Sequence, residues 1–310
     1  MGPQHAKMSE ADIRRGLAEV VERHGKWTSH RIHLGGGVYT IPENEPADIH
    51  PLRRVLQVVA DNAAKPFSEL RILDLACLEG GYSIEMALHG ARVVGVEGRD
   101  INIEKARFAK EVLGLGNVEF FQDDVRNLSA EKYGTFDVVL VLGILYHLDT
   151  PDVFHFMRRV NEVCHDFAVV DTLTSTYARI SVEHEGGTYA GHRWAEFPEG
   201  TTESGKSKFA WASLDNDMSF CFTVPSLLNM LLDAGFASVY EVKHPSDLTN
   251  YQDRFTMLAR KGTQLPLLSQ PDRSDLPVSP WPEKEARRIG APFNKEPEEA
   301  EKKRPFWRRR

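Results

Sequence analysis

The sequence predicts an α/β fold built on a doubly wound, mostly parallel sheet of seven strands. Between residue 70 and about residue 170, short apolar segments of strand length alternate with segments of helical periodicity. This alternation is typical of βαβ units, whose strands form a parallel sheet with helices on both faces. Two further apolar segments before residue 262 are expected to pair antiparallel at the edge of the sheet. The predicted strands are 71–75, 92–97, 118–122, 136–142, 167–171, 238–242 and 255–260.

The chain is predicted to divide into three parts. Residues 1–69 form an N-terminal extension, residues 70–262 hold the sheet, and residues 263–310 form a tail. Within the second part, the segment 173–222 interrupts the alternation and is rich in aromatic residues, as segments that cover a substrate often are. The expected helices are 10–24, 50–64, 82–88, 102–113, 152–163 and 223–234, with a strand pair inside 27–40.

The tail differs from the rest of the chain in composition. It contains eight of the 17 prolines, mixed charges and few aliphatic residues, which predicts disorder. Its last residues, 302–310, are basic and include Phe306 and Trp307. Two interpretations stay open for this end: a contact with an anionic membrane or RNA, and a solvated charged segment.

Composition and charge exclude several classes of protein. A net charge of −7 is not the footprint of a general nucleic-acid binder. No apolar run approaches the roughly 20 residues that cross a bilayer, and the polar N-terminus is not a secretory signal. The three cysteines are far apart in the sequence, which predicts reduced thiols and a cytoplasmic location. They form no metal-binding pattern, so we expect no metal site, and nothing in the sequence indicates an oligomeric state.

The turn after the first predicted strand is the most informative motif. Strand 71–75 contains Asp74 and leads into a turn with Gly80 and Gly81, after which a helix begins. The second strand ends in Glu97. Glycines in such a turn let the backbone approach a ligand, and an acid at the end of the next strand accepts hydrogen bonds from ribose hydroxyls. The layout predicts a nucleotide pocket at the carboxyl ends of the strands.

These motifs resemble those of the class I S-adenosylmethionine-dependent methyltransferases over about residues 70–261. The first motif of that family is an acid, an apolar residue and Gly-x-Gly-x-Gly. Here Ala76 and Leu78 stand where two of those glycines are customary. The segment Leu-Glu-Gly-Gly-Tyr at 78–82 resembles the corresponding segment of an uncharacterised subgroup of bacterial methyltransferases. The resemblance implies a Rossmann-like methyltransferase fold, an enzyme, and S-adenosyl-L-methionine as its cofactor.

The resemblance also assigns residues to the methyl donor. It implies that Glu97 grips both ribose hydroxyls and that an acid of Asp123-Asp124 meets the adenine amino group. The loop that begins at Gly143 would lie beside the methyl group. Each acid alone could be a turn cap or an exposed acid, but their order at successive strand ends favours the donor pocket. The expected cofactor-binding residues are Asp74, Ala76, Leu78, Glu79, Gly80, Tyr82, Glu97, Gly98, Asn102, Asp123, Asp124, Val125 and Gly143.

A nicotinamide-dependent oxidoreductase is the main competing interpretation, because it uses the same acid after the second strand. A pyrophosphate needs Gly-x-Gly-x-x-Gly at a helix N-terminus. Here the turn carries Glu79, whose carboxylate would repel phosphates, whereas it is compatible with the sulfonium and ammonium groups of S-adenosylmethionine. A non-catalytic protein that binds the nucleotide as a sensor or scaffold is a further alternative.

The acceptor chemistry is predicted less directly. Methyl transfer to an oxygen is an in-line displacement that usually needs a base. His147, just after the fourth strand, is the first candidate for this base, with packing or helix capping as its structural alternative. Asp171, His192 and Glu196 are weaker candidates.

The aromatic segment 173–222 is expected to meet the acceptor. Trp194, Trp211 and His192 could stack on a sugar or a ring system, or the aromatic residues could form the segment's own core. We therefore predict O-methylation of a small molecule or a glycan.

A narrower resemblance gives one more alternative. The sequence from Gly143 to Pro151 and the Asp-Arg-Phe at 253–255 are similar to the enzyme that carboxymethylates the wobble uridine of bacterial tRNA. In this resemblance Tyr146 and Arg254 would bind the carboxylate of a carboxylated donor, with Lys26 as a third partner. The alternative activity is carboxymethyl or methyl transfer to tRNA.

Overall fold

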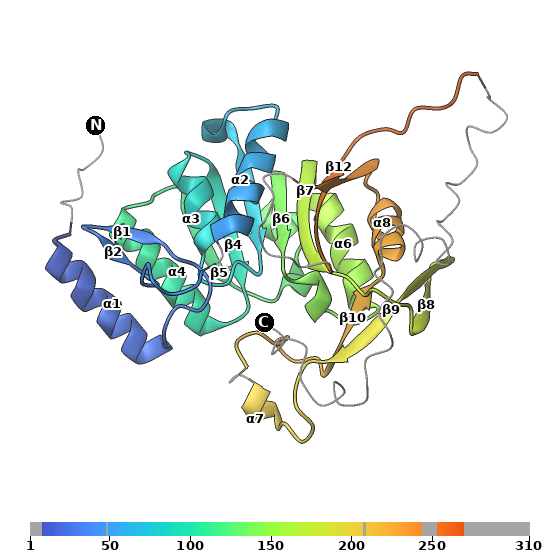
Figure 1. Cartoon of the computed structure of the whole chain (residues 1–310). Helices are drawn as coiled ribbons and strands as arrows, with labels where there is room; N and C mark the ends of the chain where they lie inside the picture. The colour runs from blue at the N-terminus through green and yellow to red at the C-terminus, as the bar shows by residue number, and fades with distance from the viewer. Residues whose placement is uncertain (1–7, 48, 207–208, 244–252, 270–310) are drawn as a thin grey trace. The chain divides into compact units, whose positions relative to one another are not determined.

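The computed structural model describes residues 8–47, 49–206, 209–243 and 253–269. It confirms the predicted α/β fold, with one seven-stranded sheet in the order β11-β12-β7-β6-β3-β4-β5 (Figure 1). Strand β3 is parallel to both β4 and β6, and β4 is parallel to β5. The strands are β3 (Arg71–Leu75), β4 (Arg92–Glu97), β5 (Val118–Gln122), β6 (Phe136–Leu142), β7 (Cys164–Leu173), β11 (Ser238–Val242) and β12 (Arg254–Arg260).

The predicted strands β3, β4, β5, β6 and β11 have the predicted bounds, whereas β7 is longer at both ends. The last two strands are neighbours at the edge, as expected, with β11 outermost. The helices of this part are α3 (Gly81–Leu88), α4 (Asp100–Leu113), α5 (Ala130–Tyr133), α6 (Asp152–Val163) and α8 (Val224–Asp233), with 3-10 turns η2 (Val125–Asn127) and η3 (Leu145–His147). Helix α5 was not predicted, because one turn capped by Ser129 is too short to show a periodicity.

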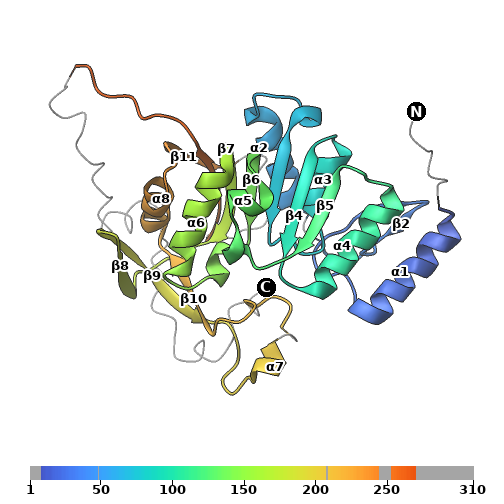
Figure 2. The same ribbon diagram turned by 180° about the vertical axis from the view of Figure 1, so that it is seen from behind.

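The N-terminal extension contains the predicted elements. They are α1 (Glu10–His24), β1 (His33–Gly35), β2 (Val38–Tyr39), α2 (Ile49–Asn62) and the 3-10 turn η1 (Phe67–Glu69). Helix α1 begins after Ser9, whose side chain accepts a hydrogen bond from the Asp12 N–H. It runs beside α4 in both views (Figures 1 and 2), and a Cβ on Gly16 would lie 2.8 Å from the Phe108 ring.

Two compact units divide the chain differently from the predicted parts. The first unit contains residues 1–142, 163–169 and 242–250, and the second contains 143–162, 170–241 and 251–310. The extension therefore belongs to the same unit as β3, β4 and β5, because α1 and the segment after it pack on the elements around turn 76–81. The predicted tail lies largely outside the described residues.

The segment 173–222 folds into a small antiparallel sheet in the second unit. Its strands are β8 (Ile180–His184), β9 (Gly187–Ala195) and β10 (Met218–Phe222), in the order β10-β9-β8, with a short helix α7 (Glu203–Lys206) before β10. The ring of Phe154 from α6 packs on Tyr189 and Phe222, with centroids 4.8 Å and 5.7 Å away. Several aromatic residues of the segment thus form a core of their own, which was one of the two alternatives.

Membrane-spanning helices are absent from the described part of the chain, because none of its helices is both long and apolar enough to cross a bilayer.

Candidate functional site

The turn between β3 and α3, residues 76–81, has a backbone with positive φ angles, including at two positions that are not glycine. Ala76 and Leu78 have φ of 55° and 50°, and Gly80 has φ of 78°. A left-handed conformation costs a residue with a Cβ about 1–2 kcal/mol. Such strain persists only where surrounding contacts impose it, and it concentrates at functional sites. Ala76 and Leu78 therefore adopt, at some cost in free energy, a backbone conformation that glycine adopts without strain.

Glu97, at the end of β4, holds this turn from one side. Its carboxylate is buried and accepts the Leu78 N–H at 3.0 Å and the Arg99 N–H at 2.8 Å, one on each oxygen. Burial raises the pKa of Glu97, and these N–H groups oppose the rise. Each carboxylate oxygen can accept two hydrogen bonds, so these two N–H groups do not by themselves saturate Glu97. This arrangement fits the two hydroxyls of a ribose.

Asp74 lies under the turn, 1% exposed, and accepts a hydrogen bond from the Ser83 hydroxyl at 2.6 Å. Burial raises the pKa of Asp74 to about 7, although the Ser83 hydrogen bond opposes the rise. Glu97 adds to it through its charge. The carboxyl therefore changes protonation near neutral pH.

Asp123 and Asp124 follow β5 and both have protein partners. Asp123 accepts hydrogen bonds from Asn127, Lys132 and Tyr133. Burial alone would raise the pKa of Asp123, but these three groups lower it to about 2. Asp124 caps η2 through the Arg126 N–H and also pairs with the Arg126 guanidinium. Their contact with an adenine ring stays a prediction.

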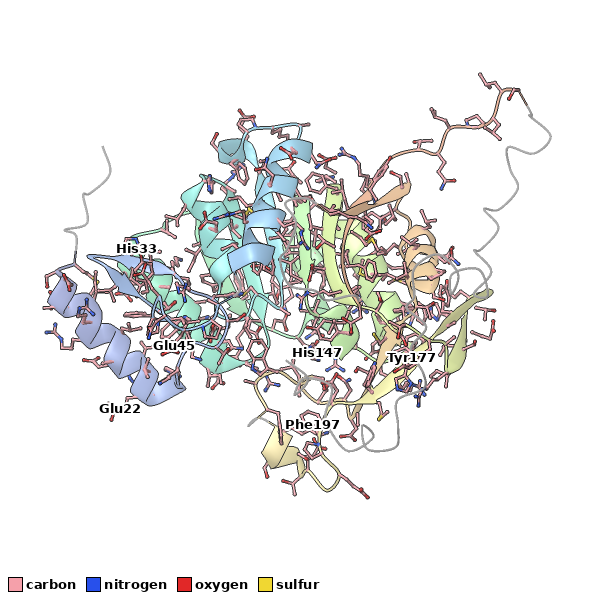
Figure 3. All side chains as sticks on the ribbon, viewed as in Figure 1. Glu22, His33, Glu45, His147, Tyr177 and Phe197 are labelled. Atoms are coloured by element: carbon pink, nitrogen blue, oxygen red, sulfur yellow. The ribbon has the colours of Figure 1, made fainter. Side chains whose placement is uncertain are left out.

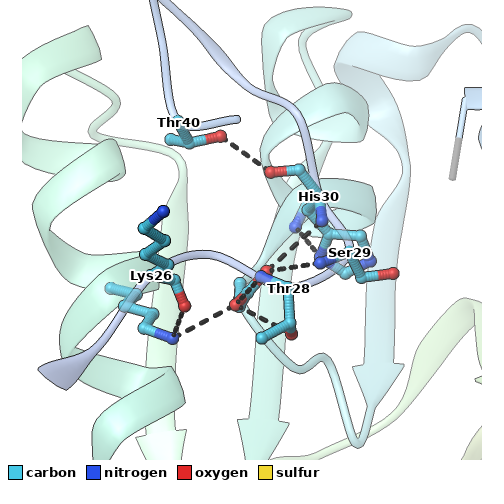
Figure 4. Close-up of polar contacts among 8 residues, drawn as sticks. Lys26, Thr28, Ser29, His30 and Thr40 are labelled. Carbon is cyan, nitrogen blue, oxygen red and sulfur yellow. Dashed lines mark hydrogen bonds and ion pairs between the residues drawn. The ribbon is translucent and has the colours of Figure 1, made fainter. Parts of the chain in front are cut away.

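Glu79 is placed differently from its expected position facing the ligand. Its side chain is fully buried, and its oxygens accept hydrogen bonds from residues 28–30 (Figure 4). Lys105 Nζ lies 3.2 Å from Oε1 and balances the charge. The argument that this charge repels phosphates and favours a cationic ligand therefore does not apply to the structure, because the charge is already paired inside the protein.

The remaining residues assigned to the methyl donor lie close to these groups. Tyr82 is 8% exposed and meets the His30 ring edge-on, with centroids 5.4 Å apart. Asn102 is buried at the start of α4 and lowers the pKa of Glu97 through a hydrogen bond. A Cβ on Gly80 would lie 2.8 Å from Ala106, so only glycine fits there. Gly98 and Val125 directly follow Glu97 and Asp124 in the chain.

In the second unit, His147 and Glu196 form a pair (Figure 3 labels His147). His147 Nδ1 lies 3.1 Å from both carboxylate oxygens of Glu196. Glu196 also accepts the Ser213 N–H at 2.8 Å. Burial acts to raise the pKa of Glu196, but the charge and hydrogen bond of His147, with Ser219, lower it on balance. A carboxylate next to Nδ1 favours the tautomer in which that nitrogen carries the proton and Nε2 accepts one.

Asp171 and Arg254 form a second pair in this unit. Asp171 is 3% exposed, and its two oxygens accept hydrogen bonds from Arg254 Nε and the Thr256 hydroxyl. Tyr146 Oη and Arg254 Nη2 both approach Gly143, at 3.4 Å and 3.9 Å from the position of a Cβ there. The structure therefore brings Tyr146, Arg254 and Gly143 together, and Asp171 binds the guanidinium, while its role as a base stays a prediction.

The aromatic candidates separate into two groups. Trp194 packs against a cluster of Tyr146, Leu173 and Cys221, and the His192 ring meets Trp194 edge-on at 4.5 Å. The ring centroids of Tyr177, which Figure 3 labels, and His192 are 6.3 Å apart. Trp211 instead lies between α7 and β10, where it is 37% exposed.

Comparison with known proteins identifies the family. A family model described as a methyltransferase domain matches residues 72–166. The ubiquinone biosynthesis O-methyltransferase of Azorhizobium caulinodans is 30% identical over 182 residues, which cover 52% of this chain and 70% of that protein. The chain belongs to the class I S-adenosylmethionine-dependent methyltransferases. It is an enzyme, and its cofactor is S-adenosyl-L-methionine.

Other relatives of this methyltransferase agree on the family and the fold. The ubiquinone biosynthesis O-methyltransferase of Mesorhizobium japonicum is 34% identical over 151 residues, or 46% of this chain and 56% of that protein. The N-terminal domain of EvdMO1, solved in the presence of SAH and D-fucose, has a TM-score of 0.62 at 21% identity, covering 84% of this chain and all of that one. Membership of this family overturns the nicotinamide and the non-catalytic alternatives.

Two features of the methyltransferase were missed from the sequence. The pairing of His147 with Glu196 joins residues 49 apart, and the contact of Thr28 with Glu79 joins residues 51 apart. Both residues of the first pair were separate candidates, but no periodicity or local motif connects them.

Lys26 is exposed, and its carbonyl accepts a hydrogen bond from Lys105.

Proposed function

We propose that this methyltransferase methylates a hydroxyl oxygen of a small molecule or a glycan, with His147 as general base. The observation that carries the proposal is the His147–Glu196 pair, in which Nδ1 lies 3.1 Å from both carboxylate oxygens. A histidine held in one tautomer by a buried carboxylate is a common general base, because its free nitrogen is basic near neutral pH.

The first unit is proposed to hold the methyl donor. When bound, S-adenosylmethionine supplies a methyl group activated by the positive charge on sulfur. Glu97 would accept hydrogen bonds from the ribose hydroxyls in addition to those from the Leu78 and Arg99 N–H groups. The left-handed backbone at Ala76 and Leu78 would let the turn approach the bound molecule closely.

The second unit is proposed to prepare the acceptor. The bound donor would supply an electrophilic methyl group to the acceptor hydroxyl, and its sulfur would be the leaving group. His147 Nε2 takes the hydroxyl proton, and Glu196 stabilises the imidazolium that results. Geometry is decisive in such a displacement, because the reacting atoms must be aligned within about 3–3.5 Å.

The chemical class of the acceptor is supported by two observations. Trp194 and His192 present rings near Tyr146 in the second unit, and aromatic rings pack well on sugars and other ring systems. Relatives are named for ubiquinone biosynthesis O-methylation, and a protein of the same fold was solved with D-fucose present. An O-methyltransferase acts on an oxygen atom, and D-fucose carries hydroxyl groups.

A methyl-transfer assay tests this proposal. The full chain is incubated with S-adenosylmethionine and a panel of phenols, quinols and sugars, and NMR locates the added methyl group. We expect an O-methyl product with at least one acceptor class. Methylation at nitrogen or carbon, at a rate unaffected by His147→Ala, would contradict the proposal.

A second candidate function is carboxymethyl transfer to tRNA. The observation that favours it is the approach of Tyr146 Oη and Arg254 Nη2 to the same glycine, Gly143. A guanidinium and a phenol together suit a carboxylate. The test is calorimetry with the carboxylated and the ordinary donor. This candidate requires the wild type to prefer the carboxylated donor and Arg254→Ala to lose that preference.

A further inference from the structure

The buried carboxylate of Glu79 joins turn 76–81 to the N-terminal strap, which we define as residues 26–41. Its Oε1 accepts the Thr28 N–H at 2.7 Å and the Thr28 hydroxyl at 3.1 Å. Its Oε2 accepts the N–H groups of Ser29 at 3.1 Å and His30 at 3.3 Å. Three successive main-chain N–H groups thus converge on one side chain (Figure 4).

The charge of Glu79 is balanced inside the protein. Lys105 of α4 lies 3.2 Å from Oε1, and the two side chains are 0% and 3% exposed. The Lys105 ammonium also donates to the carbonyl of Lys26 at 2.6 Å, so it contacts the strap as well. A buried ion pair adds little net stability, but loss of one partner leaves an uncompensated charge. Each of the two groups therefore requires the other.

The strap grips the turn at a second point. His30 Nδ1 accepts the N–H of Gly81, the first residue of α3, at 3.0 Å. A Cβ on Gly81 would lie 2.5 Å from the His30 ring, so the two residues are in direct contact. The strap fixes His30 in turn, because the Thr40 hydroxyl donates to its carbonyl at 2.7 Å.

The turn is consequently held from two sides. Leu78 donates to Glu97, whereas its neighbour Glu79 and the following Gly81 bind the strap. The left-handed residues Ala76 and Leu78 lie in this stretch. A strained backbone needs such contacts to persist, and the strap supplies those to Glu79 and Gly81.

We infer that Glu79 is a positioning residue for the methyl donor: by fastening the N-terminal strap, it holds turn 76–81 in its ligand-binding shape. The inference rests on the donor site proposed above. The Glu79 carboxylate is buried and accepts hydrogen bonds from Thr28, Ser29 and His30, so we expect it to act on the ligand indirectly. Its effect on binding passes through the turn.

Calorimetry with SAH on the full chain is the primary test. For Glu79→Gln we expect the dissociation constant to rise about 10- to 100-fold, since a small displacement of binding groups has effects of this size. The donor KM should rise more than kcat falls at saturating donor. Glu104→Gln, on the exposed face of α4, is the matched control and should leave both constants unchanged.

A second pair of variants separates positioning from stability. His30→Ala removes the acceptor of the Gly81 N–H, whereas His30→Asn places an amide oxygen near Nδ1. We expect His30→Ala to weaken SAH binding and His30→Asn to restore most of it, at similar thermal stability. The double variant Glu79→Gln/Lys105→Met removes the uncompensated charge; it should recover the melting temperature but not the affinity.

Hydrogen exchange at residues 28–30 shows whether the strap has been released. Fast exchange in Glu79→Gln together with wild-type SAH affinity would overturn the inference. The donor-site proposal fails in a different way, namely if Glu97→Ala binds SAH as tightly as the wild type.

Discussion

Two buried glutamates, one in each unit, serve different purposes. Glu79 is fully buried and surrounded by three main-chain N–H groups and the paired Lys105. Glu196 is 4% exposed, and both of its carboxylate oxygens face His147, whose side chain is 14% exposed. The first carboxylate therefore fixes a backbone, and the second orients a group that can exchange a proton.

The partners of a buried carboxylate indicate which role it has. A carboxylate that is saturated by amides has no capacity left for a reaction, so its contribution is geometric. A carboxylate beside an imidazole that reaches solvent can take part in proton transfer, because it stabilises the charge that the ring acquires. Four sets of variants test this contrast and the turn that Glu79 fastens.

The largest effect is expected at His147. Substitution His147→Ala should lower kcat by about 10²- to 10⁴-fold, the usual contribution of a general base. The affinity for SAH should not change, because the base acts on the acceptor. Steady-state kinetics and calorimetry check this, with the exposed His89→Ala as control. A wild-type kcat in His147→Ala would contradict the proposal that Glu196 orients a general base.

The next effect concerns Asp74 and pH. Burial raises the pKa of Asp74 from 3.8 to about 7, so the folded protein binds more protons than the unfolded chain between these values. The free energy of unfolding should therefore fall as pH rises from about 4 to 7, by a few kcal/mol at most. Asp74→Asn should flatten this dependence in urea titrations, whereas the exposed Asp61→Asn should not. An unchanged slope in Asp74→Asn would refute the assignment.

A smaller effect is expected at Gly81. The Cβ of Gly81→Ala would collide with His30, and forcing a side chain into a packed site costs about 1–3 kcal/mol. We expect lower thermal stability and weaker SAH binding. Gly116→Ala is the matched control, since nothing lies within 4 Å of its Cβ. Equal behaviour of the two variants would show that the strap does not press on the turn.

The smallest effect has the opposite sign. Ala76→Gly should raise the free energy of unfolding by up to about 1 kcal/mol, because glycine adopts a φ of 55° without strain. The same substitution at Ala60, in helix α2, should lower it by a similar amount. Urea unfolding of both variants measures the difference. A destabilised Ala76→Gly would mean that the turn is not strained.

Much of the fold could be predicted because its signals are local. Strands β3 to β6 are short apolar segments between turns, and their bounds agree with the prediction to the residue. The turn 76–81 was found from its glycines and from the acid that ends β4. Such patterns depend on neighbours in sequence, which the chain shows directly.

The parts that could not be predicted depend on distant contacts. The partner of Glu79 lies 51 residues earlier, and the partner of His147 lies 49 residues later. Interpreting Glu79 as a free charge failed because Lys105 carries no local sign that it is buried with it. The sheet of β8, β9 and β10 could likewise not be predicted, because its aromatic residues are equally typical of a surface that binds a ligand.

The strap has a practical consequence for defining the catalytic domain. The family model begins at residue 72, and a recombinant fragment trimmed to that point would lack Thr28, Ser29 and His30. Glu79 and Lys105 would then be exposed to water or left without their amide partners. A minimal expression fragment of this enzyme should therefore start before residue 26, well ahead of the matched region.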